Sequence, residues 1–399
     1  MLEGLAGWEP ILSYLHQVAR TRIKGLAVIL DEFPYLCESN SAIPSILQKV
    51  WDAVTRSGAH LKLVLCGSRI SFMEGILAER NPLHGRQTCE IFLEPMSYRE
   101  ASLFFPSWPA EDKIRAYGVF GGIPHYLSLC GPSDTLEENI IRLILSDGAP
   151  LQEEPNHILQ AELQNVSRYG SILKAVADGL TERGDILNRV LDRDERGSSI
   201  TPYIDKLIAL RLLKKTHSLE IKAPEKGRNA RYYLADSFLS FHFRFVLPNL
   251  SAIQAGHGRE VLRARILPHF DGYMGPWFEE VCREYVRLFG EEKLPAVAGK
   301  VGKIWAPDFD LDVAGEFLTG ERFAGECKWS RNPVGSSVLR DLRRGAARCA
   351  YFAAGAACHH VLFSRSGFTP ELRKIARADE KTRLIAPSDL LGHRRTTRS

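Results

Sequence analysis

Carboxylates and one lysine gather in a short stretch near the C-terminal end of the sequence. Asp312 lies in the run DFDLDVAG, and Glu326 and Lys328 follow in GECKW. Residues two apart share one face of a strand, so Glu326 and Lys328 should point the same way. Asp312 and Glu326 could hold Mg²⁺ that generates hydroxide at a phosphodiester, while Lys328 stabilises the developing charge. The alternative is that these acids, with Asp308 and Asp310, only line solvated strand ends.

A second candidate site follows the apolar run Leu26–Leu30, which ends in Asp31 and Glu32. In nucleotide hydrolysis one acid holds magnesium and a second polarises the attacking water, so both must emerge at the C-terminal edge of a strand. The next apolar run, Leu61–Leu65, is followed by Ser68, a small hydroxyl residue placed where it could sense a γ-phosphate. For the acid pair alone, the alternative is a solvated turn after a parallel strand.

Alternating helices and strands must position this acid pair. Apolar spacing predicts a helix over residues 11–18, then a strand at 26–30 that we expect to be central, buried and parallel. Pro44 suits a helix start, and apolar positions from 46 to 54 share one face. With the strand at 61–65, these elements make a βαβ unit with a right-handed crossover.

The middle of the chain has a different pattern. Residues 157–213 have helical apolar spacing, and two strand-like pieces, Leu212–His217 and Ala230–Ala235, flank a polar turn at Pro224–Asn229. Helices followed by a β-hairpin suggest a winged helix. The stretch from Pro248 to Gly258, rich in Gly, Asn, Ser and Gln, is expected to be a linker.

The last region is typical of an α/β domain that would carry the C-terminal carboxylates. It should begin with a helix and continue with strands and a second helix. The expected elements are the helices Pro276–Phe289 and Ser336–Phe352 and the strands Phe309–Ala314, Arg322–Lys328, His359–Ser364 and Thr382–Ala386.

Basic residues mark two surfaces that could contact DNA. A helix over about residues 199–211 carries Lys206 and Arg211 and could read DNA, although many winged helices contact only proteins. The predicted helix 336–352 carries an arginine series that is by default a solvated face, but its spacing suits phosphate contacts. The series is Arg340, Arg343, Arg344 and Arg348. From Arg331 to Ser399 there are fourteen Lys or Arg against five Asp or Glu, a balance that favours a polyanion.

Composition excludes several classes of protein. The 399 residues carry a net charge of +4, with 45% hydrophobic and 25% charged residues, as in ordinary globular domains. No apolar run reaches the roughly 18 residues of a membrane span, and the N-terminus lacks signal-peptide features, so a cytoplasmic protein is expected. The eight cysteines form no CxxC pair and are expected to be reduced thiols.

Several motifs resemble, in order and spacing, the archaeal-type ATPase family of AAA-related P-loop proteins. They are DEFPYL at 31–36, LCGSR at 65–69, PLHGR at 82–86 and GGIPHYL at 121–127, with SILKAVADG at 171–179, DSFLSF at 236–241 and GECKW at 325–329 similar to later blocks. The resemblance implies Walker B roles for Asp31 and Glu32 and a sensor role for Ser68. Arg86 and the turn Gly121–Pro124 would lie near the nucleotide, and ATP and Mg²⁺ would be the cofactors.

The C-terminal region resembles the PD-(D/E)XK nucleases, whose D…ExK arrangement is matched by Asp312, Glu326 and Lys328. Glu279, in the predicted helix before these strands, matches the family's FE pair. The resemblance implies that Glu279 would be a further metal ligand beside Asp312 and Glu326. DNA would then be the substrate.

One motif of the ATPase family is missing from the sequence. The family begins with a strand and a G-x-x-x-x-G-K-[ST] loop, whose backbone N–H groups and lysine cradle phosphates, and no segment of this sequence matches it. Gly299-Lys300 and Gly302-Lys303 lack both the leading glycine and the Ser or Thr. Either Met1 is an internal start within a longer chain, which we favour, or the protein is a natural remnant that no longer turns over ATP.

These observations predict an α/β chain with a partial P-loop ATPase domain, a winged-helix domain and a C-terminal α/β restriction-endonuclease-like domain. The expected ranges are 1–132 for the partial ATPase domain, 133–156 for a helical connector, 157–250 for the winged helix, 251–265 for a linker, 266–392 for the nuclease-like domain and 393–399 for a basic tail. We expect an ATPase-family protein whose C-terminal domain binds DNA and cleaves it with a metal ion. The alternative is a non-catalytic DNA-binding or regulatory protein that has lost both ATP hydrolysis and cleavage.

Overall fold

The computed structural model describes residues 7–21, 25–190, 199–220, 230–306, 309–352 and 358–392. Asp308, the predicted turn at 224–229 and the basic tail at 393–399 lie outside these residues. The chain divides into two compact units, of which the first is Met1–Leu93 with Ile158–Gln164 and the second is Glu94–His157 with Asn165–Ser399. The boundary after Leu93 falls inside the range 1–132, and the domain ranges stay predictions.

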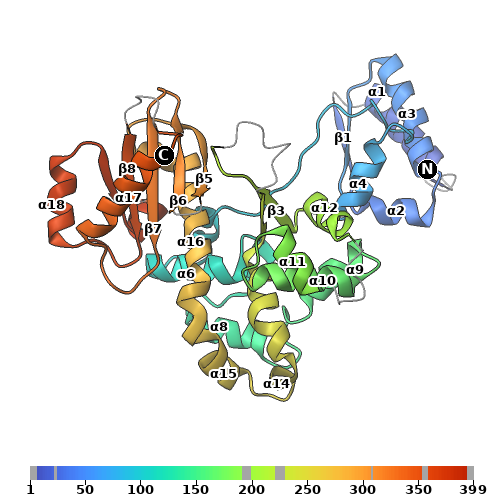
Figure 1. The fold of residues 1–399 in the computed structure, drawn as a ribbon. Helices are drawn as coiled ribbons and strands as arrows, with labels where there is room; N and C mark the ends of the chain where they lie inside the picture. Colours follow the sequence, from blue (N-terminus) through green and yellow to red (C-terminus); the bar gives the residue numbers. More distant parts are fainter. Residues whose placement is uncertain are drawn as a thin grey trace. The chain divides into compact units, whose positions relative to one another are not determined.

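The first unit combines helices with a two-stranded parallel sheet (Figure 1). Its elements are α1 (Trp8–Thr21), β1 (Leu26–Leu30), α2 (Phe33–Ser39), α3 (Ile43–Ser57), β2 (Leu61–Leu65) and α4 (Ile70–Leu77). The strands pair from Leu26↔Leu61 to Leu30↔Leu65, which confirms both predicted strands and their parallel direction. Pro44 lies in the first turn of α3, as its fixed backbone angle favours.

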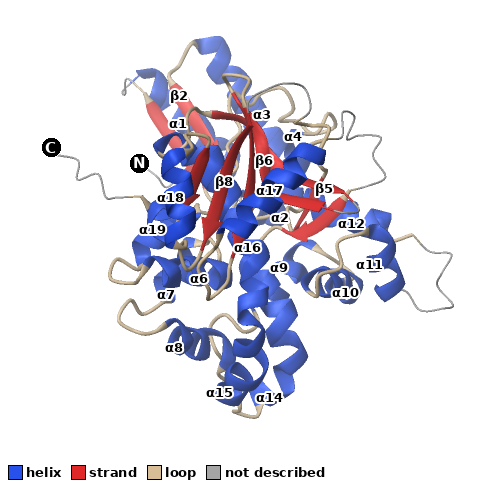
Figure 2. Cartoon of the chain, turned by 60° about the vertical axis from the view of Figure 1, so that its left-hand side comes forward, coloured by secondary structure: helices blue, strands red, loops and turns tan. Residues whose placement is uncertain are grey.

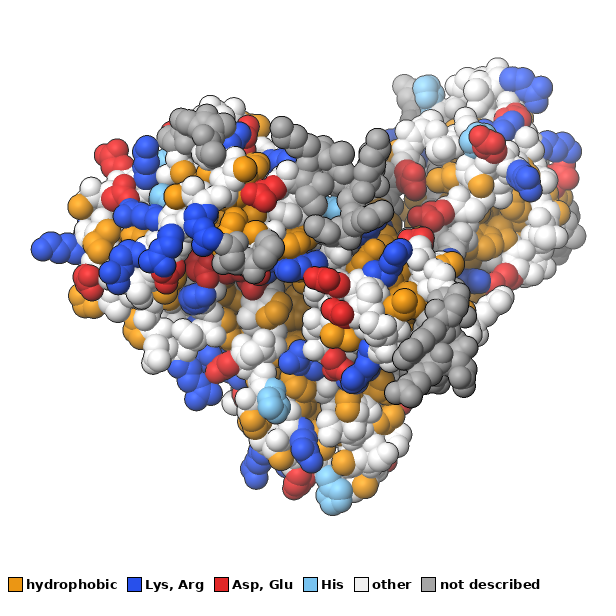
Figure 3. Space-filling model, viewed as in Figure 1, with side chains coloured by type: hydrophobic (Ala, Val, Ile, Leu, Met, Phe, Trp, Pro, Cys, Tyr) orange, Lys and Arg blue, Asp and Glu red, His pale blue; other side chains and the backbone are white. Residues whose placement is uncertain are grey.

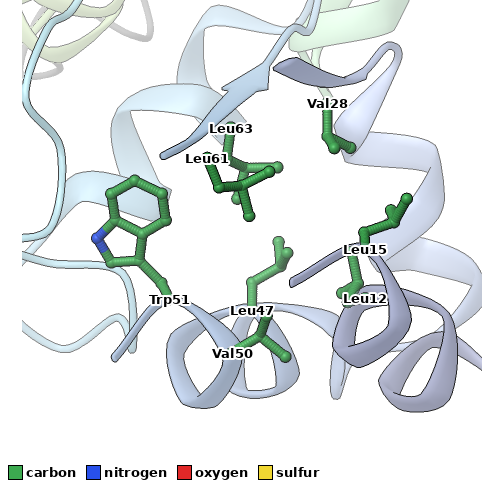
Figure 4. A pocket seen from close by; sticks show the side chains of 8 residues that line it. All are labelled: Leu12, Leu15, Val28, Leu47, Val50, Trp51, Leu61 and Leu63. Atoms are coloured by element: carbon green, nitrogen blue, oxygen red, sulfur yellow. The ribbon is translucent and has the colours of Figure 1, made fainter. Parts of the chain in front are cut away.

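One face of this sheet is covered and the other is exposed. The covered face is closed by apolar side chains of α1, α3 and both strands (Figure 4), namely Leu12, Leu15, Val28, Leu47, Val50, Trp51, Leu61 and Leu63. The space between them is about 10 Å³, too small for a ligand. On the other face Ile29 is 64% exposed and Val64 is 43% exposed. The prediction of a buried central strand is therefore wrong for the described part of this unit, because helices cover only one side.

The second unit begins with short helices whose starts are fixed by polar side chains. Ser97 and Glu100 form a reciprocal cap at α5, and Thr135 and Glu138 do the same at α8, so the first N–H groups of these helices have partners. The helices are α5 (Tyr98–Ala101), α6 (Ala110–Phe120), α7 (Pro124–Leu129), α8 (Leu136–Ile140), α10 (Val166–Ala177), α11 (Arg183–Val190), α12 (Thr201–Ala209) and α13 (Ser237–Phe241), while α9 (Glu154–Glu162) runs across the boundary between the units. Within the described ranges, no helix has the length and apolar character needed to cross a bilayer.

Three helices and a β-hairpin form one group in the second unit. α10, α11 and α12 precede β3 (Leu213–Thr216), which pairs in the antiparallel direction with β4 (Arg231–Leu234). A bridge between Glu182 and Arg231 adds a third extended segment beside the hairpin. The two strand-like pieces predicted on either side of the polar turn are thus confirmed.

The stretch expected to be a linker is helical. α14 (Leu250–Gln254) and α15 (Gly258–Val261) lead through one wide turn into the long helix α16. Gly258 is buried, and a Cβ atom there would lie 1.8 Å from the carbonyl oxygen of Leu145. The glycine therefore permits close packing of two backbones. The prediction of a linker from Pro248 to Gly258 is wrong, because tertiary packing outweighs the loop-like composition.

The C-terminal part of the second unit is a five-stranded sheet with helices packed on it (Figure 1 and Figure 2). In spatial order the strands are β5 (Ala298–Ala306), β6 (Phe309–Phe317), β7 (Arg322–Lys328), β8 (Cys358–Ser364) and β9 (Thr382–Ile385). β5, β6 and β7 are antiparallel, whereas β7, β8 and β9 are parallel. The helices are α16 (Leu267–Phe289), α17 (Ser336–Arg348), α18 (Pro370–Ala378) and α19 (Pro387–Leu391). The predicted α/β layout is confirmed, although β5, α18 and α19 were not predicted.

Neighbouring residues of β8 show which helix covers which face of this sheet. Leu362 belongs to a hydrophobic core with Leu339 of α17. Phe363 instead meets Tyr285 of α16, with ring centroids 6.4 Å apart. Since successive strand residues point to opposite faces, α16 and α17 lie on opposite sides of the sheet. Burial on both sides accounts for the apolar run at residues 361–363 in β8.

Candidate functional site

The predicted metal ligand Asp312 lies in an irregular part of β6. The pairing of β5 with β6 shifts register here, so that one residue of β5, Lys303, faces two residues of β6, Asp312 and Val313. A β-bulge of this kind re-aims side chains and is common beside functional sites. It also breaks the alternation expected from the sequence, because Leu311, Asp312 and Val313 are all buried between the two helical layers.

The Asp312 carboxylate takes the place of part of the ladder between β6 and β7. Pairing of these strands ends at Val313↔Gly325. Beyond that pair, the backbone N–H of Cys327 donates a hydrogen bond to Asp312 Oδ2 at 3.0 Å. From α16, the Arg283 guanidinium donates to the backbone carbonyl of Asp312 at 2.7 Å. These two bonds fix Asp312 where the strands part.

Two more of the predicted ligands lie near Asp312. Burial, and after it the negative charges of Glu279 and Glu326, raises the pKa of Asp312 to about 7. The hydrogen bond from Cys327 and the ammonium of Lys303 act in the opposite direction. The three carboxylates are therefore close enough for their charges to interact, which is a condition that any shared set of ligands must meet.

A lysine that sequence reasoning did not assign to this site lies among the acids. The Lys303 Nζ atom is 2.8 Å from Glu279 Oε2 and 3.8 Å from Asp312 Oδ1, and the side chain is only 15% exposed. Burial by itself lowers the pKa of Lys303, but the charges of Glu279 and Asp312 outweigh it and raise the pKa. The ammonium therefore stays charged. No local pattern signals this contact, because strand β5 has no clear period and Gly302-Lys303 resembles only a fragment of a phosphate loop.

Arg283 is a second residue that sequence reasoning missed. Its guanidinium is 3.0 Å from Glu280 Oε2 and 3.4 Å from Glu279 Oε2 on the same helix, in addition to its bond to β6. Its side chain is 13% exposed. The spacing of four residues from Glu279 is a signal that could have found it, since such pairs are neighbours on a helix.

The residues present do not fit a bound metal ion in this arrangement. Lys328 Nζ lies 2.5 Å from Glu326 Oε1, and Lys303 is paired with Glu279, so two of the three carboxylates already have a cationic partner. Mg²⁺ requires oxygen ligands at about 2.0–2.1 Å in near-octahedral geometry. In the part of the chain that the structure describes, no group of three Asp, Glu, His or Cys side chains is placed to hold a metal ion.

In the first unit, three of the predicted nucleotide-site residues meet at the ends of β1 and β2. Ser68 Oγ donates to Glu32 Oε2 at 3.3 Å, and the Glu32 N–H donates to Asp31 Oδ1 at 3.0 Å. Glu32 has a left-handed backbone, with φ 47° and ψ 45°, and directly precedes α2. Gly67 permits this approach of the two loops, because a Cβ atom there would lie 2.7 Å from Pro34 Cδ. Two carboxylates and a hydroxyl are thus presented at one edge of the sheet.

Arg86 forms bonds to other residues of the first unit. Its guanidinium makes a two-point ion pair with Asp52 of α3, at 2.8 and 3.1 Å, and donates to the Pro82 carbonyl at 3.0 Å. The pair lowers the pKa of Asp52, chiefly through the hydrogen bond. These bonds hold the PLHGR loop to α3, and a nucleotide role for Arg86 stays a prediction. The Gly121–Pro124 turn belongs to the second unit.

The predicted arginine series lies exposed on α17. Its members are Arg340, Arg343, Arg344 and Arg348. Figure 3 shows Lys and Arg side chains gathered over α17 and α18, on the left of the view. Arg343 is 2.6 Å from Asp379, and Arg344 is 3.5 Å from Asp341. Exposed pairs of this kind are weak, so a phosphate can compete for these arginines.

The predicted DNA-reading helix corresponds to α12, Thr201–Ala209, and is shorter than expected. Lys206 lies on it, half-buried. Arg211 lies beyond its end, with a left-handed backbone (φ 56°) and an ion pair to Glu94 at 2.5 Å. The prediction that the helix itself carries Arg211 is therefore wrong, because the chain turns into β3 at this point.

A basic groove that was not predicted lies elsewhere in the second unit. Its volume is about 520 Å³, within the range of small-molecule sites. Its basic lining residues are Arg189, Arg244, Arg265 and His269. The lining also includes the carboxylate Asp178, which is paired with Lys174 at 2.5 Å and with Arg189 of the lining at 3.9 Å. The balance of charge therefore attracts anions.

Comparisons with known proteins match most of the chain. Residues 8–130 match a family described as an ATPase domain predominantly from Archaea, and residues 242–340 match one described as archaeal and bacterial proteins of unknown function. The uncharacterized protein MJECL04 of Methanocaldococcus jannaschii is 30% identical over 311 residues, which cover 77% of this chain and 66% of that protein, just under two thirds of its length. Among solved structures, the ORC2 protein of Aeropyrum pernix in ADPNP–ADP complexes matches with a TM-score of 0.29 and 13% identity over 65% of this chain and 72% of that one. Protein VC1899 of Vibrio cholerae matches with a TM-score of 0.23 and 12% identity over 95% and 92%.

Proposed function

Because residues 8–130 of this chain match an ATPase family found predominantly in Archaea, we propose that the chain joins a nucleotide-responsive first unit to a DNA-binding, nuclease-like C-terminal domain. The observation that carries the proposal is the exposed arginine series on α17. Arginines spaced along one helix suit a row of phosphates, and their binding releases counterions from DNA. The basic groove of the same unit is a further surface for phosphates.

The order of elements supports the two fold assignments within the second unit. Three helices followed by the β3–β4 hairpin support the proposed winged helix, in which α12 would be the helix that enters a DNA groove. Asp312 lies where β6 and β7 part, and Glu326 and Lys328 lie on β7, an arrangement that supports the proposed nuclease-like assignment. Lys206 on α12 is proposed as a second DNA contact.

Metal-dependent cleavage is the second candidate function of the C-terminal domain. In its favour, the charges of Glu279 and Glu326 both act on Asp312. Against it, lysines already neutralise Glu279 and Glu326. The ion pairs therefore favour DNA binding over cleavage, and no step of hydrolysis follows from this arrangement.

The first unit is proposed to bind the phosphates of ATP with Mg²⁺ at the edge of β1 and β2. In hydrolysis by such domains, acids at this edge hold the metal ion and orient the attacking water. The hydrogen bond between Ser68 and Glu32, and the position of Asp31 beside it, support this role. ATP then acts as the signal for the DNA-binding domain.

Binding to DNA can be tested by fluorescence anisotropy of a labelled duplex with the full chain, in EDTA and at several salt concentrations. In the double variant Arg340→Gln/Arg344→Gln, the slope of log K against log salt should fall by about 2, since each lost phosphate contact removes about 0.9. The control is Arg20→Gln/Lys62→Gln, which removes the same charge from exposed positions of the first unit. Equal losses in both variants, or no binding by the wild type, would refute the proposal.

A further inference from the structure

The ammonium of Lys303 occupies the space between two acids that a shared metal ion would need. It lies 2.8 Å from Glu279 and 3.8 Å from Asp312, on the single β5 residue that faces the bulge in β6. Divalent ions such as Mg²⁺ bind carboxylate oxygens at about 2.0–2.6 Å, so a metal ion bound to both acids would overlap this ammonium. Two cations cannot share that space.

The acids around Lys303 are held in place by hydrogen bonds and an ion pair to other residues. The Asp312 carboxylate is fixed by the N–H of Cys327, and its backbone is fixed by Arg283. Arg283 also remains beside Glu279, at 3.4 Å. Loss of the Lys303 charge would therefore leave the carboxylates in place with less positive charge beside them, which favours recruitment of another cation.

We infer that the ammonium of Lys303 takes the place of a metal ion beside Glu279 and Asp312. It thereby excludes divalent metal ions from these two acids. The inference rests on the proposed nuclease-like centre but requires no cleavage. It makes Lys303 the residue that decides between a metal-free, DNA-binding form of this domain and a form that takes up a metal ion. The matched control is Lys300, an exposed lysine on the same strand.

The test is a titration of the full chain with Mn²⁺, in which electron paramagnetic resonance measures the free ion. Lys303→Met should bind one more Mn²⁺ than the wild type, or bind it at least about tenfold more tightly. Lys300→Met should behave as the wild type does. Adding Glu279→Gln to Lys303→Met should remove the gained binding. If Lys303→Met gains nothing over the wild type, or if Lys300→Met gains as much, the inference is wrong.

Thermal unfolding gives a second readout that needs no activity. Lys303→Met should unfold at a lower temperature than the wild type in EDTA and should regain stability in Mn²⁺, because a ligand that binds only the folded state stabilises it. Lys303→Gln keeps a polar side chain and serves if the methionine variant does not fold. A wild type that Mn²⁺ stabilises as strongly as the variants would overturn the inference. The DNA-binding assay is run in EDTA, so failure there refutes the proposed function and leaves the Mn²⁺ result standing.

Discussion

Asp312 and Cys327 are joined by a hydrogen bond from a backbone N–H to a carboxylate oxygen, 3.0 Å long, at the point where β6 and β7 part. The acid thereby completes a ladder that the backbone leaves open. An amide side chain in place of the acid can still accept this bond through its oxygen. The chemistry of the position can therefore be changed while the local fold is kept.

Asp312→Asn should abolish any nicking of plasmid DNA that depends on Mg²⁺ or Mn²⁺ and should leave the affinity for DNA largely unchanged. The substitution removes a potential metal ligand, whereas the exposed arginines of α17 remain. Plasmid nicking and fluorescence anisotropy on the same preparation measure the two properties. Full cleavage by a variant free of contaminating nuclease would show that Asp312 is not part of the centre.

ATP should bind this chain with a dissociation constant weaker than about 1 μM. Asp31 and Glu32 act on a phosphate that already carries magnesium, and no segment of the sequence matches the glycine-rich loop that would hold the phosphates. Calorimetric titration with Mg²⁺ and ATP measures the constant, and Asp31→Asn shows whether any weak binding uses this site. Tight binding would point to a different phosphate site.

Arg265→Gln should weaken DNA binding and lower its salt slope by about 0.9, the share of one phosphate contact. Arg265 lines the basic groove, whereas Arg263, two residues earlier and also exposed, does not belong to its lining. Arg263→Gln should therefore change the slope less. Anisotropy titrations at three salt concentrations separate the two variants, and indistinguishable slopes would mean that the groove takes no part.

His242 should make the second unit less stable in mild acid. In the unfolded chain a histidine takes up a proton near pH 6.5, whereas burial lowers the pKa of His242 to about 4 in the folded chain. Between these values the unfolded state binds more protons, so the free energy of unfolding falls as the pH falls, by at most about 1.4 kcal/mol per unit. The stability that neutral His242 contributes is fully present above the pKa of the unfolded chain. It is lost as the pH falls toward the pKa of the folded chain.

Urea unfolding followed by tryptophan fluorescence, at about pH 7 and pH 4.5, measures this effect. His242→Leu should lose less stability across the window than the wild type. His257→Gln, which changes an exposed histidine of the same unit, should lose as much as the wild type. The same loss in His242→Leu and in the wild type would contradict the assignment.

Much of the fold could be predicted because several strands have a clear local pattern in the sequence. β1, β2 and β7 are apolar runs or alternating stretches next to turns, and each has the bounds predicted from the sequence. β5 was missed because AGKVGKIWA mixes glycine and lysine with apolar residues and has no clear period. The helices over residues 250–266 were missed because Gly258 acts through a contact with Leu145, more than one hundred positions away.

The candidate site was predictable in its residue types but not in its charge balance. Period and motif bring Glu326 and Lys328 to one strand face. The bulge at Asp312 depends on the pairing between β5 and β6, which no local pattern encodes. The position of Lys303 follows from that bulge. The acids could therefore be predicted from the sequence, whereas the lysine that lies between two of them could not.

Glu32 has a consequence for the evolution of this protein. A residue with a side chain costs about 1–2 kcal/mol in the left-handed backbone region, a cost that glycine avoids. Selection for heat tolerance alone would therefore favour glycine or asparagine at position 32 and discard the carboxylate. A laboratory screen for thermostable variants is expected to return changes at this position among its first hits. Each such change would raise thermal stability and remove the carboxylate at the strand edge.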